Sequence, residues 1–140
     1  MPDAAANPWE DVLIADLRAH GGRPSGGPLA GHPLLLMWST GASSGLERRA
    51  ILTYSTDGND IVVAGTASGA PEDPAWVANV EKTPQVRLEV AGETYNATAS
   101  LLRSGPERDR LWASHVAVLP WFGKYEEKTL RLIPVIRLSR

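Results

Sequence analysis

The chain of 140 residues contains no cysteine, and this absence excludes several kinds of site at once. Disulfides, thiolate nucleophiles and cysteine-ligated metals all need that side chain. The three histidines, His20, His32 and His115, are too widely separated to have the spacing of a metal site. We therefore expect no metal, and we interpret His115, on the apolar side of an expected helix, as a packing residue.

Long hydrophobic runs and an excess of positive charge are missing as well. The longest apolar run is about half a membrane-spanning helix, so no stable membrane insertion is expected. A net charge of −2 argues against nucleic acid as a partner. No basic segment followed by an apolar one opens the sequence, so we expect a cytoplasmic protein.

Short apolar segments bounded by turns dominate the rest of the chain, and they predict strands. We expect strands at residues 34–39, 48–55, 60–65, 85–90, 93–102 and 132–138. The first is apolar throughout, which is typical of a strand buried on both faces, whereas the fourth alternates strictly. Thr56-Asp57-Gly58-Asn59 predicts a hairpin turn between the second and third strands.

Helix signals lie around and between these strands. A helix is expected at about residues 8–20, capped by Asn7, with Trp9 on its apolar face. A second helix starts at Pro74 with Asp73 as its N-cap. A capping box at residues 104–107 predicts a third helix, and residues 120–131 are expected to be helical in part.

Strands joined mainly by hairpins, with helices inserted between them, define the expected fold class. They predict an α+β, mainly β protein, an antiparallel barrel of about six strands with peripheral helices. A chain of this length builds one hydrophobic core. We therefore expect a single barrel domain over residues 1–140.

Two loops of glycine and hydroxyl residues follow apolar strands, at residues 40–45 and 64–70. Such loops can present backbone N–H groups to an anionic ligand, although a simple turn has the same composition. Arg48 and Arg49 are neighbours in a strand and point to opposite faces. One of them can bind a phosphate or carboxylate, and the other is interpreted as a surface charge.

The aromatic residues leave two interpretations open. The five tryptophans can line a pocket for a flat ligand or fill a small core. Tyr125, close to Trp121 and Phe122 in the sequence, can close over a bound ring and supply a proton. Aromatic packing of a late helix explains the same residues.

Several short motifs follow one another in a specific order from about Trp9 to Leu138. They are Leu17-Arg18-Ala19-His20-Gly21-Gly22, Ser39-Thr40-Gly41 with Ser44-Gly45, Pro74-Ala75-Trp76 with Asn79, Arg108-Asp109-Arg110-Leu111-Trp112, and Ile133-Pro134-Val135. In this order and spacing the chain resembles the deazaflavin-dependent nitroreductase family. The resemblance implies a split β-barrel related to flavin-mononucleotide-binding folds, with the deazaflavin coenzyme F-420 as cofactor.

The resemblance also implies roles for residues at matching positions. The coenzyme's phosphate tail would be held by Thr40, Gly41, Ser43, Ser44, Gly45 and Arg48. Its ring would lie along Gly65, Thr66, Ala67, Ser68, Gly69, Pro74 and Ala75, positioned by Trp76 and Asn79. The substrate would meet Trp38, Trp121, Phe122 and Tyr125, with Tyr125 as the catalytic proton donor.

The chain departs from the family pattern at two positions. The first loop often reads Gly-x-Lys-Ser-Gly, but here Ser43 stands at the lysine position. The second often reads Ser-Lys-Gly-Gly, but here Ala67 and Ser68 replace the Lys-Gly pair. Two cations that would contact a polyanionic coenzyme are therefore missing, and Arg48, Arg49 and Arg23 are the candidates to compensate.

These features lead to one functional hypothesis and two alternatives. We expect an oxidoreductase that passes a hydride from reduced coenzyme F-420 to an apolar conjugated acceptor, such as a quinone, enone or nitroaromatic. The alternatives are a relative that binds flavin mononucleotide, and a cofactor-free barrel enzyme or binding protein for a hydrophobic ligand. The expected partner is a small hydrophobic substrate, and the expected assembly is a monomer or homodimer.

Overall fold

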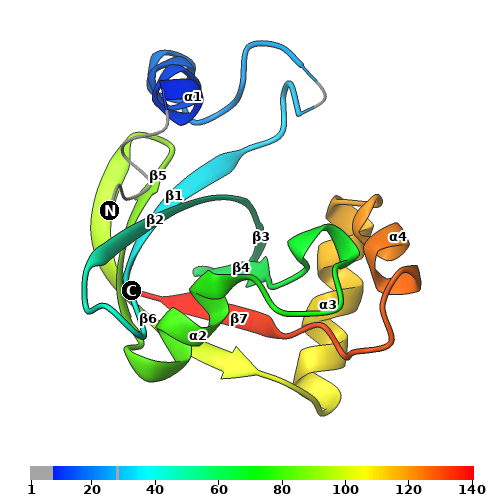
Figure 1. Ribbon diagram of the computed structural model, residues 1–140. Helices are drawn as coiled ribbons and strands as arrows, with labels where there is room; N and C mark the ends of the chain where they lie inside the picture. Colours follow the sequence, from blue (N-terminus) through cyan, green and yellow to red (C-terminus); the bar gives the residue numbers. More distant parts are fainter. Residues whose placement is uncertain (1–7, 28) are drawn as a thin grey trace.

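The computed structural model describes residues 8–27 and 29–140 (Figure 1). Its strands are β1 (Leu34–Thr40), β2 (Glu47–Thr53), β3 (Ser55–Asp57), β4 (Asp60–Ala64), β5 (Gln85–Val90), β6 (Glu93–Leu102) and β7 (Val135–Ser139). Its helices are α1 (Pro8–Ala19), α2 (Ala75–Lys82), α3 (Pro106–Val118) and α4 (Phe122–Glu127), with the short 3-10 helix η2 (Ala67–Gly69). Asn7, the predicted cap of α1, lies outside the described residues.

The antiparallel sheet curls until its two edges meet. Its order is β2-β1-β5-β6-β7-β4-β3, so β2 and β3 are the edge strands, yet Tyr54 alone separates them along the chain. Six strand spacings of about 4.8 Å would hold the edges of a flat sheet roughly 29 Å apart. Two residue steps span at most about 7 Å. The sheet is therefore a barrel with a split between β2 and β3, and the predicted split β-barrel is confirmed.

The prediction of one strand at residues 48–55 is wrong. The strand breaks at Tyr54, because the chain leaves one edge of the sheet there and joins the other. This break gives seven strands in place of about six. The predicted hairpin is confirmed, since Asp57 pairs with Asp60 across a turn of two residues.

The barrel interior is filled from the strands and from α2. Leu35 and Met37 of β1 and Leu88 of β5 are almost completely buried there. Val77 and Val80 of α2 belong to the same cluster. Helix α2 is therefore part of the core, and the residues on its other side are held in fixed positions relative to the sheet.

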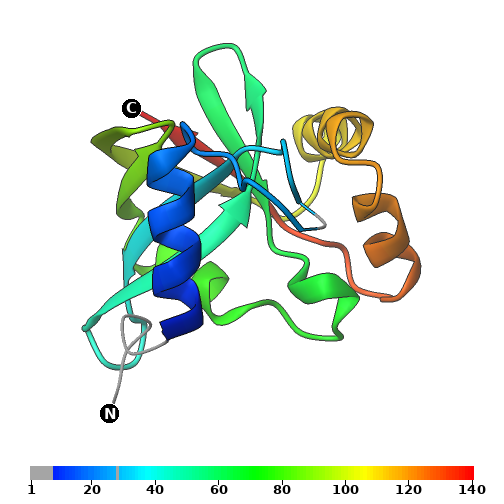
Figure 2. The same cartoon turned by 90° about the horizontal axis from the view of Figure 1, so that it is seen from above.

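Strand β1 is buried on both faces, as its unbroken apolar run predicts. Leu34 and Leu36 face away from the barrel interior and pack against Ile14 and Leu17 of α1. Figure 2 shows α1 on the opposite side of the barrel from α3 and α4. The predicted apolar face of α1 is wrong for Trp9, whose residue surface is 71% exposed, because Trp9 borders an open pocket instead of packing on β1.

Helices α3 and α4 cover β4 and β7. Leu111 and Phe122 are buried against Val62 and Val135 in one cluster. The capping box predicted for α3 is wrong, because the N-cap is Gly105 at φ 104°, and no side chain caps it. Glycine adopts this backbone conformation without strain, and the Glu107 side chain instead pairs with Arg137 at 2.9 Å.

Asp73 does not cap α2, which corrects the second helix-start prediction. The N-cap position is Pro74, and no side chain bonds to the first turn. The Asp73 carboxylate lies 2.8 Å from Arg131 and 3.1 Å from Arg103. Hydrogen bonds between a guanidinium and a carboxylate are stronger than a bond to a neutral backbone N–H, so the two arginines determine the position of this side chain.

The interpretation of His115 as a packing residue is confirmed, and its surroundings give it a titration signature. The ring is fully buried, its Nδ1 lies 2.6 Å from Ser55 Oγ, and its edge meets Phe122 with ring centres 4.7 Å apart. No described residue is a hydrogen-bond partner for Nε2. Burial lowers the pKa of His115 from 6.5 to about 4, so the ring is neutral at physiological pH.

We predict that His115 makes the protein less stable in mild acid. Between its unfolded and folded pKa values, only the unfolded chain binds the proton, so the free energy of unfolding falls as the pH decreases through this window. From about pH 7.5 to pH 5 the loss should be about 2 kcal/mol. Urea unfolding at both pH values measures it, and His115→Gln should lose most of this dependence. The matched control His20→Gln removes an exposed ring; equal pH dependence in both variants would contradict the assignment.

Candidate functional site

An elongated groove follows the free edge of β2, along the split of the barrel. It consists of two adjoining pockets, one bordered by residues 48–50 and the other by residues 51–53 of the same strand. The loop pocket, of about 470 Å³, lies between β2, α2 and residues 41–44. The aromatic pocket, of about 400 Å³, lies between β2, α1, α4 and residues 64–68. Each volume is typical of a small-molecule site.

The structure brings together most of the residues predicted to form the site. Those that line the loop pocket are Gly41, Ser43, Ser44, Arg48, Ala75, Trp76 and Asn79. Those that line the aromatic pocket are Thr66, Ser68, Trp121, Phe122 and Tyr125.

The loop that joins β1 to β2 is held in shape by hydrogen bonds at both ends. The Gly41 N–H donates to the Leu46 carbonyl at 2.8 Å, and the Gly45 N–H donates to the Gly41 carbonyl at 2.9 Å. The Ala42 N–H donates to Asn79 Oδ1 at 2.9 Å, which ties the loop to α2. Within the described part of the chain, the amides of Ser43 and Ser44 have no acceptor. These two N–H groups are free to bind an anion.

Arg48 and Arg49 point to opposite faces of β2, as predicted. Arg48 reaches back to the loop, where its Nη2 lies 3.4 Å from Ser44 Oγ, while its buried Nη1 has no partner among the described residues. A buried guanidinium nitrogen without an acceptor is costly, so this atom is an available donor. Arg49 is not the predicted surface charge. It is largely buried and pairs with Glu10 of α1 at 3.0 Å and with Asp11 at 3.6 Å.

The segment after β4 is an unusual turn that Arg131 holds from outside. Ala67 and Ser68 have positive φ values of 47° and 57°, which non-glycine residues seldom adopt. The Arg131 guanidinium donates to the Thr66 carbonyl at 2.9 Å and to the Ala70 carbonyl at 3.1 Å. It also pairs with Asp73, so one side chain fixes both ends of the turn.

Two glycines of this segment are required by close packing. A Cβ on Gly65 would lie 2.6 Å from Val77 Cγ2, inside contact distance. A Cβ on Gly69 would lie 2.8 Å from Lys128 Cβ and 3.0 Å from the Tyr125 carbonyl. Figure 1 shows η2 beside α4 in this arrangement. Because Gly69 has no side chain, the turn lies directly against α4, the helix that carries Tyr125.

An aromatic cluster forms the α4 wall of the aromatic pocket. The ring of Phe122 meets Tyr125 edge-on at 5.3 Å between centres and lies 5.8 Å from Trp121. The opposite wall carries Leu13 of α1 and Ile51 of β2. Hydroxyl groups of Thr53, Thr66 and Ser68 add a polar side. The pocket therefore suits a flat, mostly apolar ligand with a few polar atoms.

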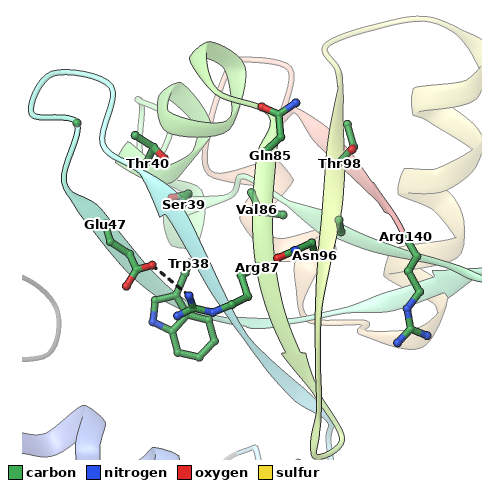
Figure 3. A pocket seen from close by; sticks show the side chains of 12 residues that line it. Trp38, Ser39, Thr40, Glu47, Gln85, Val86, Arg87, Asn96, Thr98 and Arg140 are labelled. Atoms are coloured by element: carbon green, nitrogen blue, oxygen red, sulfur yellow. Dashed lines mark ion pairs between the residues drawn. The ribbon is translucent and has the colours of Figure 1, made fainter.

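Trp38, Thr40 and Gly45 line neither pocket of the groove. They line a separate polar cleft of about 530 Å³ on the β1-β5-β6 part of the sheet (Figure 3). There the Arg87 guanidinium lies 4.4 Å from the centre of the Trp38 ring and 3.4 Å from Glu47. Gly65, Ala67, Gly69 and Pro74 line neither pocket of the groove, and they act on its shape through the backbone.

Sequence reasoning missed two residues at this site. The Lys82 ammonium donates to the Ala42 carbonyl at 2.8 Å, across a separation of 40 residues. Arg131 reaches partners 58 to 65 residues away. Neither lies in a motif, so only the scarcity of lysine in this chain, with three among 14 basic residues, could have drawn attention to Lys82.

Residues 8–27 and 29–140 have neither a metal-binding cluster nor a membrane-spanning helix. No group of three or more histidine, aspartate or glutamate side chains is arranged to hold a metal ion. No helix has both the length and the apolar character that a bilayer span requires.

The fold and the groove together define a class of protein. A split barrel that carries a loop with free amides and an aromatic pocket along one strand edge has the shape and donors to suit a long ligand with one charged and one flat end. The chain belongs to the F420H(2)-dependent quinone reductase family, whose sequence signature matches residues 12–139. This membership confirms the resemblance to deazaflavin-dependent enzymes.

Individual relatives agree with the family assignment. A Mycobacterium tuberculosis protein named as an F420H(2)-dependent quinone reductase is 31% identical over 110 residues, which cover 77% of this chain and 74% of that protein. A solved F420-H2-dependent reductase structure superposes with a TM-score of 0.70 at 31% identity, over 76% of this chain and 94% of the other. A second structure, described as a domain-swapped dimer, has a TM-score of 0.71 at 29% identity, over 95% of this chain and all of the other.

We predict that Asn79→Ala destabilises the protein by about 1 kcal/mol, because the half-buried Ala42 N–H loses its acceptor. Asn79 itself is 7% exposed, so water cannot readily replace the amide. Urea unfolding measures the change. Asn96→Ala is the matched control, since Asn96 is exposed on β6 and should shift the unfolding free energy by less than about 0.5 kcal/mol. Equal stability of the two variants would show that the link between α2 and the loop is not needed.

Proposed function

We propose that this protein catalyses hydride transfer from reduced deazaflavin coenzyme F-420 to a quinone or a similar conjugated acceptor, such as an enone or nitroaromatic. The observation that carries the proposal is the pair of pockets along β2, one beside a loop with free amides and the other lined by aromatic side chains. A coenzyme with a phosphate tail and a flat ring needs both pockets. The quinone reductase name of the relatives supports a quinone as the acceptor.

The loop pocket fits the phosphate of such a coenzyme. The free amides of Ser43 and Ser44 and the unpartnered Nη1 of Arg48 are donors that a phosphate oxygen would satisfy. Of the arginines considered for the missing lysines, Arg49 is paired with α1 and Arg23 donates to the Gly31 carbonyl. Arg48 is therefore the arginine that we assign to the tail.

The other end of the groove would hold the ring and the acceptor. The turn at residues 64–69 offers a backbone surface with small side chains, and Trp76 would help to position the coenzyme from α2. When bound, the coenzyme supplies the hydride, and the protein contributes orientation and electrostatics. Trp121 and Phe122 would hold the acceptor against this surface and limit the access of water.

Tyr125 is our candidate for the proton that a reduced acceptor needs. It lines the aromatic pocket from α4, and the Gly69 contact fixes its backbone against the ring-binding turn. A phenol hydroxyl in this position can donate a hydrogen bond to a quinone oxygen and transfer a proton to it as charge develops. Its role would be that of a general acid at the acceptor.

Titration of the protein with coenzyme F-420, followed by quenching of tryptophan emission, tests the proposal. Trp76 lines the loop pocket and should report binding. Arg48→Ala should weaken the affinity about tenfold or more, because a charge-assisted hydrogen bond contributes about 1.5–3 kcal/mol. Arg87→Ala, in the separate cleft of Figure 3, is the matched control and should bind normally.

The result also separates the proposal from its alternatives when flavin mononucleotide is titrated in parallel. Saturable binding of coenzyme F-420 alone supports the proposal. Preferential binding of flavin mononucleotide would favour a flavin-dependent relative. Binding of neither coenzyme would favour a cofactor-free protein for a hydrophobic ligand, and an unchanged affinity of Arg48→Ala would remove Arg48 from the site.

We predict that Tyr125→Phe lowers the turnover of a quinone substrate at least tenfold and leaves coenzyme affinity nearly unchanged, because only the hydroxyl is lost. Steady-state rates with reduced coenzyme and a short-chain quinone, together with the tryptophan titration, measure both quantities. Tyr54→Phe removes a hydroxyl that lies outside both pockets and is the matched control. Full turnover in Tyr125→Phe would restrict Tyr125 to a packing role.

The assembly and the location of the protein complete this proposal. A monomer or homodimer and a cytoplasmic location stay predictions. Sedimentation of the purified protein and fractionation of the cells that produce it are the measurements that check them.

A further inference from the structure

The loop pocket is positively charged, and only part of this charge is neutralised within the protein. Residues 40–45 contain no charged side chain. The cations around them are Arg48, Arg49 and Lys82. Arg49 is paired with two carboxylates of α1, whereas no carboxylate in the described part of the chain lies within ion-pair distance of Arg48 or Lys82. The charge available to an anion at this loop comes from these two side chains.

Lys82 is held at the loop by the same helix that fixes the loop's shape. Its Nζ donates to the Ala42 carbonyl, and the Ala42 N–H donates to Asn79 Oδ1, so α2 contacts both polar groups of one residue. Positions 79 and 82 are three apart and lie on one face of the helix. An ammonium has three donors, and one of them is used here. Two N–H donors of an exposed, unneutralised cation therefore remain at the loop, on the side of the Ala42 carbonyl.

We propose that Lys82 binds the phosphate tail of the coenzyme together with Arg48. Helix α2 then supplies a cation that the loop itself lacks. This inference rests on the proposed function, because it needs a ligand with an anionic tail in the loop pocket. The phosphate would be bound between β2 and the end of α2. Affinity for the tail then depends on the position of α2, and ionic strength weakens it because Lys82 is exposed.

Binding of two ligands by matched variants tests the proposal. The ligands are coenzyme F-420 and the deazaflavin chromophore that lacks the phosphate tail, and the variants are Lys82→Ala, Lys82→Arg and Lys124→Ala. Lys124 is an exposed lysine on α4 with no contact to the loop and serves as the control. Tryptophan quenching measures each dissociation constant at low and high salt.

Lys82→Ala should bind the coenzyme about tenfold more weakly, with a smaller dependence on salt. It should bind the tailless chromophore as the unmodified protein does. Lys82→Arg should recover most of the loss, and Lys124→Ala should show none.

Two outcomes would overturn the inference while the proposed function stands. One is that the unmodified protein binds the coenzyme and the Lys82→Ala variant binds it with equal affinity. The other is an equal loss for the coenzyme and the tailless chromophore, which would mean that Lys82 acts through the shape of the loop alone. If the unmodified protein binds no coenzyme F-420, the proposed function itself fails, and this inference fails with it.

Discussion

The single residue between β2 and β3 constrains the rest of this molecule. Tyr54 must connect the two edges of a seven-stranded sheet, so the sheet has to curl. The free edge of β2 is then left without a neighbouring strand. The groove lies along that edge, with α2, the turn after β4 and α4 as its far wall. Barrel closure and the groove are thus two results of one chain connection.

Local patterns in the sequence predict most of the sheet. The apolar run of β1 and the alternation of β5 depend on the two faces of a strand, which neighbouring residues reveal. The break at Tyr54 was missed because it depends on where the other edge of the sheet lies. The N-cap expected of Asp73 and the capping-box role expected of Glu107 failed for a similar reason. Distant arginines bind the Asp73 and Glu107 side chains more strongly than a helix terminus does.

The motifs point to residues that line the two pockets, but they do not point to the charged side chains Lys82 and Arg131 around them. The hydroxyl and glycine residues of both loops carry a recognisable order, and Ser43, Ser44 and Ser68, which this order singles out, line the groove. Trp38 was grouped with the other aromatic residues, yet strand alternation directs it to another face, where it packs with Arg87. Lys82 and Arg131 contact backbone carbonyls, and such contacts leave no pattern in a sequence because every residue has a carbonyl.

Helix α2 belongs to two environments at once. Val77 and Val80 are packed inside the barrel, while Asn79 and Lys82 of the same two turns hold the loop outside. A helix cannot shift one of these faces and leave the other in place. Substitutions among the buried valines would therefore move the donors that surround the loop, without touching any ligand. A change in the barrel core is then a route by which the loop's donors are rearranged while every residue that lines the pocket stays the same.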